Sequence, residues 1–170
     1  MIRQYKHKEL QELVRTSYFV PEIHSDIPGV ELCAALKNVL ALGVGMFEGM
    51  KSGDNTKAFF LIKSLQELVV LLESFGGKKE TVYGLAGIGD LVMTAFGALG
   101  RNRNFGKKIG EGIDPKILLT QLQPEGVTTV VALYQLLQAR GLELPIFQAL
   151  YQIIYENKQV GYLKDLLKNY

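Results

Sequence analysis

The sequence predicts an all-α protein, and its hydropathy pattern carries that prediction. From residue 30 almost to the C-terminus, apolar residues recur at helical spacing, and short breaks that contain glycine or proline separate the segments. Residues that favour a strand are concentrated only over residues 16–23. A chain of 170 residues with 48% hydrophobic and 21% charged residues is long and apolar enough to bury a sizeable core.

The first 28 residues predict a short helix and a strand. Residues 5–15 place their apolar side chains on one side of an amphipathic helix. Aromatic and branched residues favour an extended strand over residues 16–23, and Pro21 restricts it to the edge of a sheet. The break that follows offers Ser25 or Asp26 as the N-cap of the next helix.

The remaining chain predicts a series of helices. The first runs over residues 30–50, and the second runs over residues 56–74, before a pair of glycines. Proline stands at the start of later helices, after Asp114 and after Leu144, where its missing N–H does no harm. Further helices are expected over residues 79–83, 90–96, 102–110, 115–122, 125–139, 145–157 and 163–168.

Composition argues against several classes of function. A net charge of +2 is too small to indicate nucleic acid or an acidic membrane surface as a partner. Cys33 is the single cysteine and reads as a small buried hydrophobe, and residues 1–16 contain no apolar signal segment, so we expect a cytoplasmic protein. The most apolar stretch, residues 58–72, is interrupted by charges and predicts a core helix, not a membrane span. His7 and His24 have no partner at ligand spacing, so we expect no metal site.

Lys37 is the most informative residue, because it lies in the middle of an apolar helix. Its neighbours at helical spacing are all small or apolar: Cys33, Ala34, Leu40, Ala41 and Val44. The usual arrangement is a lysine stem along apolar surface with the ammonium in water. The alternative is an ammonium packed among apolar groups, which destabilises the charged form and suits a lysine that exchanges protons. Lys37 is therefore a candidate general base.

Two later segments accompany the lysine helix. The helix carries G-V-E-L-C-A-A-L-K-N over residues 29–38, and G-L-A-G-I-G-D-L and R-N-R-N-F-G follow over residues 84–91 and 101–106. In this order and at these separations, they resemble the C-terminal half of the NAD(P)-dependent glycerol-3-phosphate dehydrogenases, over about residues 29–146. The resemblance implies a helical, bundle-like substrate domain of the 6-phosphogluconate-dehydrogenase type. It also implies interconversion of sn-glycerol 3-phosphate and dihydroxyacetone phosphate with NAD or NADP, for glycerophospholipid synthesis.

The resemblance further implies roles for individual residues. Lys37 is the implied catalytic base. The implied substrate contacts are Lys37, Asn38, Asp90, Thr94, Arg101 and Asn102. The implied cofactor contacts are Arg101, Gln123 and Glu125.

Asp90 and Arg101 stand where helices are predicted to begin. Aspartate is a favoured N-cap, and the resemblance turns the same carboxylate toward substrate and lysine; one oxygen could serve each role. At Arg101 and Asn102, the free N–H groups of a helix start and a bidentate guanidinium suit a phosphate. A solvated basic cap is the alternative, and we expect that arrangement for Arg103, Lys107 and Lys108.

Other implied site residues also have simpler explanations. Asn38 could be an amide on a helix surface, and Thr94 a hydroxyl inside a helical core. Glu125 is also a favourable first-turn acid. Gly100 stands where bacterial relatives commonly have a serine, so one side-chain donor is missing.

The sequence shows no dinucleotide-binding unit of its own. Gly43, Gly45 and Gly49 resemble a glycine fingerprint, but the last spacing is one residue too long and the run lies within a predicted helix. We therefore expect residues 1–28 to be a remnant of a nucleotide-binding domain or a linker. Residues 29–170 form the expected helical substrate and catalytic domain. The chain's own nucleotide-binding domain is the expected partner, a homodimer is left open, and the chain alone is expected to be inactive.

Two other functions stay open on the sequence alone. One is a non-catalytic helical module that dimerises or binds a partner, which an exposed Lys37 far from Asp90 and Arg101 would favour. The other is the helical domain of a different hydroxy-acid dehydrogenase, which a pocket without an anion site at Arg101 would favour.

Overall fold

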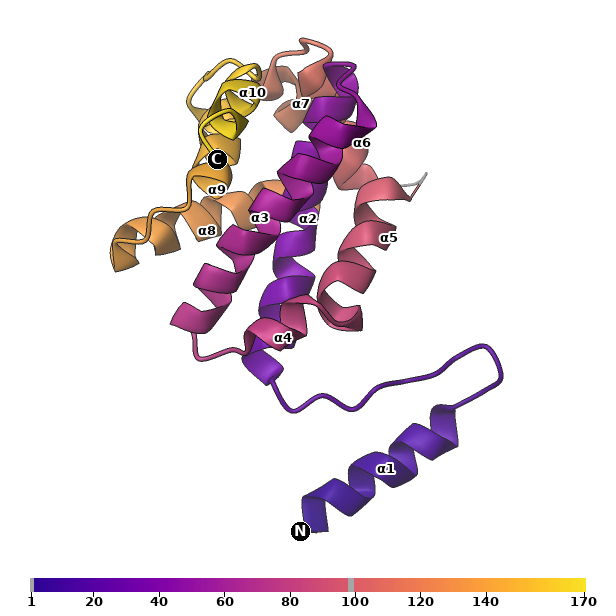
Figure 1. The fold of residues 1–170 in the computed structure, drawn as a ribbon. Helices are drawn as coiled ribbons and strands as arrows, with labels where there is room; N and C mark the ends of the chain where they lie inside the picture. The colour runs from indigo at the N-terminus through magenta and orange to yellow at the C-terminus, as the bar shows by residue number, and fades with distance from the viewer. Residues whose placement is uncertain (1, 98–99) are drawn as a thin grey trace.

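The computed structural model describes residues 2–97 and 100–170, which form helices and connecting turns without a β-strand (Figure 1). The all-α prediction is therefore confirmed. The elements in chain order are α1 (Ile2–Val14), α2 (Ile27–Gly49), α3 (Asp54–Ser74), α4 (Lys79–Val82), the π-helical turn η1 (Leu85–Gly89), α5 (Asp90–Phe96), α6 (Arg101–Gly110), α7 (Pro115–Gln121), α8 (Glu125–Arg140), α9 (Pro145–Tyr155) and α10 (Tyr162–Leu167).

Helix α2 forms the centre of the bundle, and α3, α5, α6, α8 and α9 pack around it. Residues 39–47 are all buried, as expected for a helix that is apolar on every side. Among the described helices, α2 alone is long and apolar enough to cross a membrane, but 61% of that apolar window is buried inside the bundle. Helix α2 is therefore the central helix of the core, and the candidate site described below lies beside it.

Helices α2 and α6 cross so closely that their backbones touch. Glycines four residues apart line both sides of the crossing: Gly45 and Gly49 on α2, and Gly106 and Gly110 on α6. A Cβ on Gly45 would lie 2.0 Å from the Arg103 carbonyl oxygen, and one on Gly106 would lie 1.9 Å from that of Leu42. The glycine run that resembles a nucleotide fingerprint thus serves helix packing.

The N-terminal segment stands apart from the bundle (Figure 1). The predicted strand over residues 16–23 is wrong, since this stretch has no regular secondary structure. Within the segment, the Gln11 side chain donates a hydrogen bond of 2.6 Å to the Pro21 carbonyl. Leu13 and Tyr18 are 79% and 90% exposed. Strand-favouring residues need a neighbouring strand and a buried face, and this segment has neither.

The start of α2 differs from its predicted start because a side-chain N-cap decides it. The helix predicted from residue 30 begins at Ile27, because the Asp26 carboxylate accepts a 3.0 Å bond from the Gly29 N–H as an N-cap. The same carboxylate accepts from the Lys78 N–H at 2.8 Å and from the Thr81 hydroxyl at 2.5 Å, which ties α4 to α2. These bonds hold the pKa of Asp26 below its usual range.

The start of α9 is capped from another helix. The buried Glu67 carboxylate of α3 accepts hydrogen bonds from the Ile146 N–H at 2.8 Å and the Phe147 N–H at 3.2 Å. The Tyr170 hydroxyl donates to the same carboxylate. Burial raises the pKa of Glu67 despite these partners.

Candidate active site

Lys37 and Asp90 form an ion pair at one edge of α2. Their side chains are 22% and 25% exposed, so the pair is largely sheltered. The predicted apolar surroundings of Lys37 are only partly found, because its ammonium meets a carboxylate and neighbouring Ala34 is exposed. The lysine is therefore positioned by a charged partner and not by apolar packing alone.

The turn η1 delivers Asp90 to this position. Gly87 makes the turn possible, because a Cβ there would lie 2.1 Å from the Val82 carbonyl oxygen at the end of α4. The expected N-cap role of Asp90 is wrong: the N-cap of α5 is Gly89, and Asp90 is the first helical residue. Its second carboxylate oxygen lies 3.5 Å from the Thr94 hydroxyl, one turn along the same face. Asp90 thus links Lys37 to Thr94.

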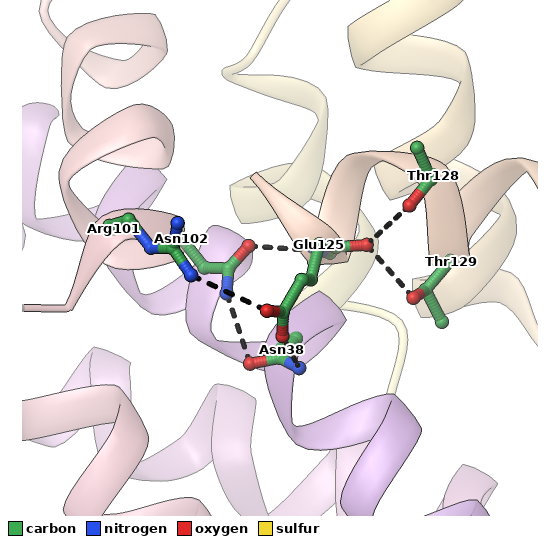
Figure 2. A network of polar contacts seen from close by, with 7 residues as sticks. Asn38, Arg101, Asn102, Glu125, Thr128 and Thr129 are labelled. Carbon is green, nitrogen blue, oxygen red and sulfur yellow. Dashed lines mark hydrogen bonds and ion pairs between the residues drawn. The ribbon is translucent and has the colours of Figure 1, made fainter. Parts of the chain in front are cut away.

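A network of polar side chains joins α2, α6 and α8 beside this pair (Figure 2). The amide of Asn102 is buried and donates to the Asn38 side-chain oxygen at 3.0 Å. Its own oxygen accepts from the Gly126 N–H at 2.8 Å, at the first turn of α8. The Asn38 amide in turn donates to Glu125 at 3.3 Å. Asn38 is therefore part of an interhelical network and not a free surface amide.

Arg101 lies at the outer edge of the network. Its guanidinium faces the Glu125 carboxylate at 3.4 Å, and both side chains are about 70% exposed (Figure 2). An ion pair this exposed is weak, so the guanidinium is available to another anion.

Most of the predicted site residues line one open cleft of about 470 Å³. The lining residues are Asn38, Met93, Thr94, Gly97, Gly100, Arg101, Asn102 and Glu125. The Lys37–Asp90 pair adjoins this cleft, since Asp90 contacts Thr94 and Lys37 precedes Asn38 in α2. The structure therefore brings residues 37, 38, 90, 94, 101, 102 and 125 together.

Gln123 is the predicted site residue that the structure places elsewhere. Its exposed amide donates to the Leu119 carbonyl at 3.3 Å, and it does not line the cleft. Gly100 does line the cleft and is the N-cap of α6, with no side-chain capping bond. A Cβ on Gly100 would lie 3.1 Å from the Thr94 carbonyl oxygen, a tight approach that favours glycine here.

Sequence reasoning missed the part played by Arg103. Its side chain is only 18% exposed, and its Nε lies 3.4 Å from a Glu48 carboxylate oxygen. Its NH1 group donates to the Phe96 carbonyl at 2.9 Å. Lys107 pairs with the other Glu48 oxygen at 2.8 Å, and these cations hold the pKa of Glu48 below its usual range. The expectation of solvated side chains is therefore wrong for Arg103. Lys107 pairs with Glu48 but stays 42% exposed, and Lys108 is exposed as expected.

The donor set suits proton transfer and anion binding. Among residues 2–97 and 100–170, no group of three or more histidine, cysteine, aspartate or glutamate side chains could hold a metal ion. Cys33 is buried, and burial raises its pKa to about 11, which keeps the thiol protonated. The polar groups that line or adjoin the cleft are the Lys37 amine, the carboxylates of Asp90 and Glu125, the amides of Asn38 and Asn102, the Thr94 hydroxyl and the Arg101 guanidinium.

Comparisons with known proteins identify the family of this chain. Residues 26–164 match the family described as the NAD-dependent glycerol-3-phosphate dehydrogenase C-terminus. The chain is 42% identical over 155 residues to a glycerol-3-phosphate dehydrogenase [NAD(P)+] of Levilactobacillus brevis, covering 90% of this chain and 46% of that protein. It is 43% identical over 148 residues to the protein of the same name from Thermobifida fusca, covering 86% and 44% of the two chains.

Among solved structures, the crystal structure of glycerol-3-phosphate dehydrogenase from Coxiella burnetii superposes with a TM-score of 0.87 at 35% identity. The match covers 96% of this chain and 51% of that one. The chain thus spans about half the length of the relatives it matches. It belongs to the family of NAD-dependent glycerol-3-phosphate dehydrogenases and corresponds to their all-helical C-terminal domain.

Proposed function

We propose that this chain supplies the substrate half of an NAD(P)-dependent dehydrogenase that interconverts sn-glycerol 3-phosphate and dihydroxyacetone phosphate. The observation that carries the proposal is the Lys37–Asp90 pair beside a cleft that presents Arg101 and Asn102. A proton-transferring amine and an anion-binding group are the requirements of a phosphorylated secondary alcohol that is oxidised to a ketone.

Lys37 moves the proton in this proposal. The bound nicotinamide exchanges a hydride with the carbon that bears the oxygen. In the direction of reduction, the ammonium of Lys37 donates its proton to the ketone oxygen; in the direction of oxidation, the neutral amine accepts it from the hydroxyl. Asp90 orients the lysine head group through their ion pair. Thr94 and Asn38 lie beside the pair and can hydrogen-bond the hydroxyl groups of the substrate.

Arg101 anchors the phosphate in this proposal. Its exposed guanidinium can form parallel hydrogen bonds to phosphate oxygens. The first turn of α6 adds free N–H groups, since Gly100 caps the helix without a side-chain acceptor. Asn102 fixes this turn against α2 and α8 and borders the same cleft.

The cofactor contacts from this chain are few. Arg101 and Glu125 are exposed at the rim of the cleft and can meet NAD or NADP, and Gln123 lies in the turn before Glu125. The remaining contacts belong to a nucleotide-binding domain, the partner that we infer for residues 29–170. In this proposal residues 1–28 connect to that domain, and the assembled enzyme works in the cytoplasm.

The two rival functions required different geometry. A non-catalytic helical module would be favoured by a Lys37 far from Asp90, yet these side chains are in contact. A dehydrogenase for an unphosphorylated hydroxy acid would be favoured by a pocket that lacks an anion-binding group at position 101, yet the Arg101 guanidinium lines the cleft. The first observation favours a catalytic domain, and the second favours a phosphorylated substrate.

Titration of the 170-residue chain with glycerol 3-phosphate tests the proposal. Amide resonances of Arg101, Asn102 and residues near Lys37 should shift in nitrogen–proton correlation spectra, and glycerol at equal concentration should not shift them. Arg101→Ala should weaken binding at least about tenfold, because it removes a charge-assisted anchor. Lys108→Ala is the matched control, since it removes an exposed charge from the same helix. Equal shifts with glycerol, or equal losses in both variants, would contradict the proposal.

A further inference from the structure

The Arg103 side chain ties together helices that carry different parts of the cleft. It follows Asn102 directly in α6, yet its side chain is only 18% exposed and does not line the cleft. Its NH1 group donates to the Phe96 carbonyl at the last residue of α5, and its Nε faces Glu48 of α2 at 3.4 Å. One side chain of α6 therefore contacts α2 and α5, two of the helices that hold site residues.

The contact with Phe96 fixes an otherwise loose helix end. The last carbonyls of a helix have no partner within the helix, and Phe96 carries one of them. Helix α5 is short, it begins with Asp90, and Thr94 lies in its last turn. In contrast to the glycine crossing that locks α6 against α2, α5 packs mainly against α2 and has few direct contacts with α6, one of which is the bond from Arg103 to Phe96. Arg103 is thus placed to set where Asp90 and Thr94 lie relative to Arg101.

An arginine suits this task better than a lysine. A planar guanidinium directs several N–H groups in fixed directions. The NH1 group of Arg103 donates to the Phe96 carbonyl, while its Nε lies at ion-pair distance from Glu48 without a hydrogen-bond partner among the described residues. A lysine ammonium on its flexible stem lacks these fixed directions, so it can reach Phe96 or Glu48 but is not directed at both. The Glu48 charge, which Lys107 also neutralises, keeps the arginine in place from the α2 side.

We propose that Arg103 is a positioning residue that holds the Asp90–Thr94 side of the cleft at a fixed separation from the Arg101 anion anchor. The inference rests on the proposed function, because it assumes a substrate that spans both sides. A ligand that spans both sides gains affinity only when the two are correctly spaced. Inorganic phosphate occupies the anchor alone, so its affinity does not depend on that spacing.

The test compares dissociation constants for glycerol 3-phosphate and inorganic phosphate, measured by nuclear magnetic resonance titration of the 170-residue chain. Arg103→Lys keeps the charge. It should raise the dissociation constant for glycerol 3-phosphate about tenfold and change the dissociation constant for phosphate by less than about twofold. Glu48→Gln should also weaken binding of glycerol 3-phosphate more than binding of phosphate, because it removes the charge that orients the arginine. Lys108→Ala is the control and should leave both constants unchanged.

Each outcome decides a different point. If the wild-type chain binds glycerol 3-phosphate no more tightly than phosphate, no ligand spans the cleft, and the proposed function and this inference are both overturned. If the wild type discriminates but Arg103→Lys keeps the same ratio of constants, the inference alone is overturned. Equal weakening of both ligands also overturns it, because that result indicates a general effect of the arginine on structure or charge.

Discussion

Replacing Gly106 by alanine tests the close crossing of α2 and α6. The added Cβ would lie 1.9 Å from the Leu42 carbonyl oxygen, whereas ordinary contact begins at 3.4 Å. Backbone on the facing helix cannot rotate away as a side chain could, so the helices have to separate by about 1.5 Å or distort. Gly45, Gly49 and Gly106 at the crossing are buried, and separation would open gaps among the core residues around them.

The expected loss of stability follows from two opposing effects. Overpacking in a well-packed core costs about 1–3 kcal/mol, and the upper end applies because the contact is with backbone. Alanine returns about 1 kcal/mol through its higher helix propensity. We expect Gly106→Ala to lower the free energy of unfolding by about 2 kcal/mol, which corresponds to a Tm decrease of about 4–8 °C for a chain of this size.

Thermal and urea unfolding, followed by circular dichroism at 222 nm, measure this effect. Gly161→Ala is the matched control, because no heavy atom lies within 4 Å of its added Cβ and its φ of −58° suits alanine. The control should stay within about 0.5 kcal/mol of wild type. If both variants unfold at the same midpoint, the backbones do not touch and the reasoning about the crossing is refuted.

Three further predictions concern the site and the buried carboxylate. In an enzyme completed by a nucleotide-binding domain, Lys37→Met should abolish turnover yet leave the circular dichroism spectrum unchanged, and near-normal steady-state turnover would remove the lysine from the mechanism. In the same enzyme, Arg101→Ala should raise KM for glycerol 3-phosphate at least about tenfold, and an unchanged KM would exclude it as the phosphate anchor. Glu67→Gln should alter the pH dependence of stability. Because burial raises the pKa of Glu67 above its usual 4.5, the folded state binds this proton more tightly, so wild-type stability relative to the variant should increase as pH falls from neutral to about 5. Urea midpoints at the two pH values check this, and a constant difference between the proteins would count against it.

The helices of the bundle were predictable because their signals are local. Apolar periodicity and proline or glycine at the ends depend on residues a few positions apart, and α3, α8 and α9 lie close to their expected ranges. The strand over residues 16–23 failed because strand preference depends on a neighbour that pairs with it, which local sequence does not reveal.

The site was predictable only in part. Lys37 and Asp90 are 53 positions apart, and the family resemblance, not periodicity, brought them together in the prediction. The resemblance implied that the Asp90 carboxylate faces the lysine, and the two side chains do pair, whereas the N-cap role that the local pattern suggested falls to Gly89. Arg103 gave no signal, because its partners Glu48 and Phe96 become neighbours only when α2, α5 and α6 pack. The positions of the basic residues in residues 101–108 would equally fit charged side chains on a solvent-exposed face of a helix.

The backbone contact between α2 and α6 also has an evolutionary consequence. Lys37 is carried by one of these helices and Arg101 by the other, so the crossing fixes the distance between the proposed proton donor and the proposed anion anchor. Small drifts in sequence cannot widen this distance while Gly45 and Gly106 remain, because the backbones are already in contact. A descendant that accepts a longer or shorter substrate therefore has to change the side chains of the cleft, or lose the glycines and rebuild the core around the crossing.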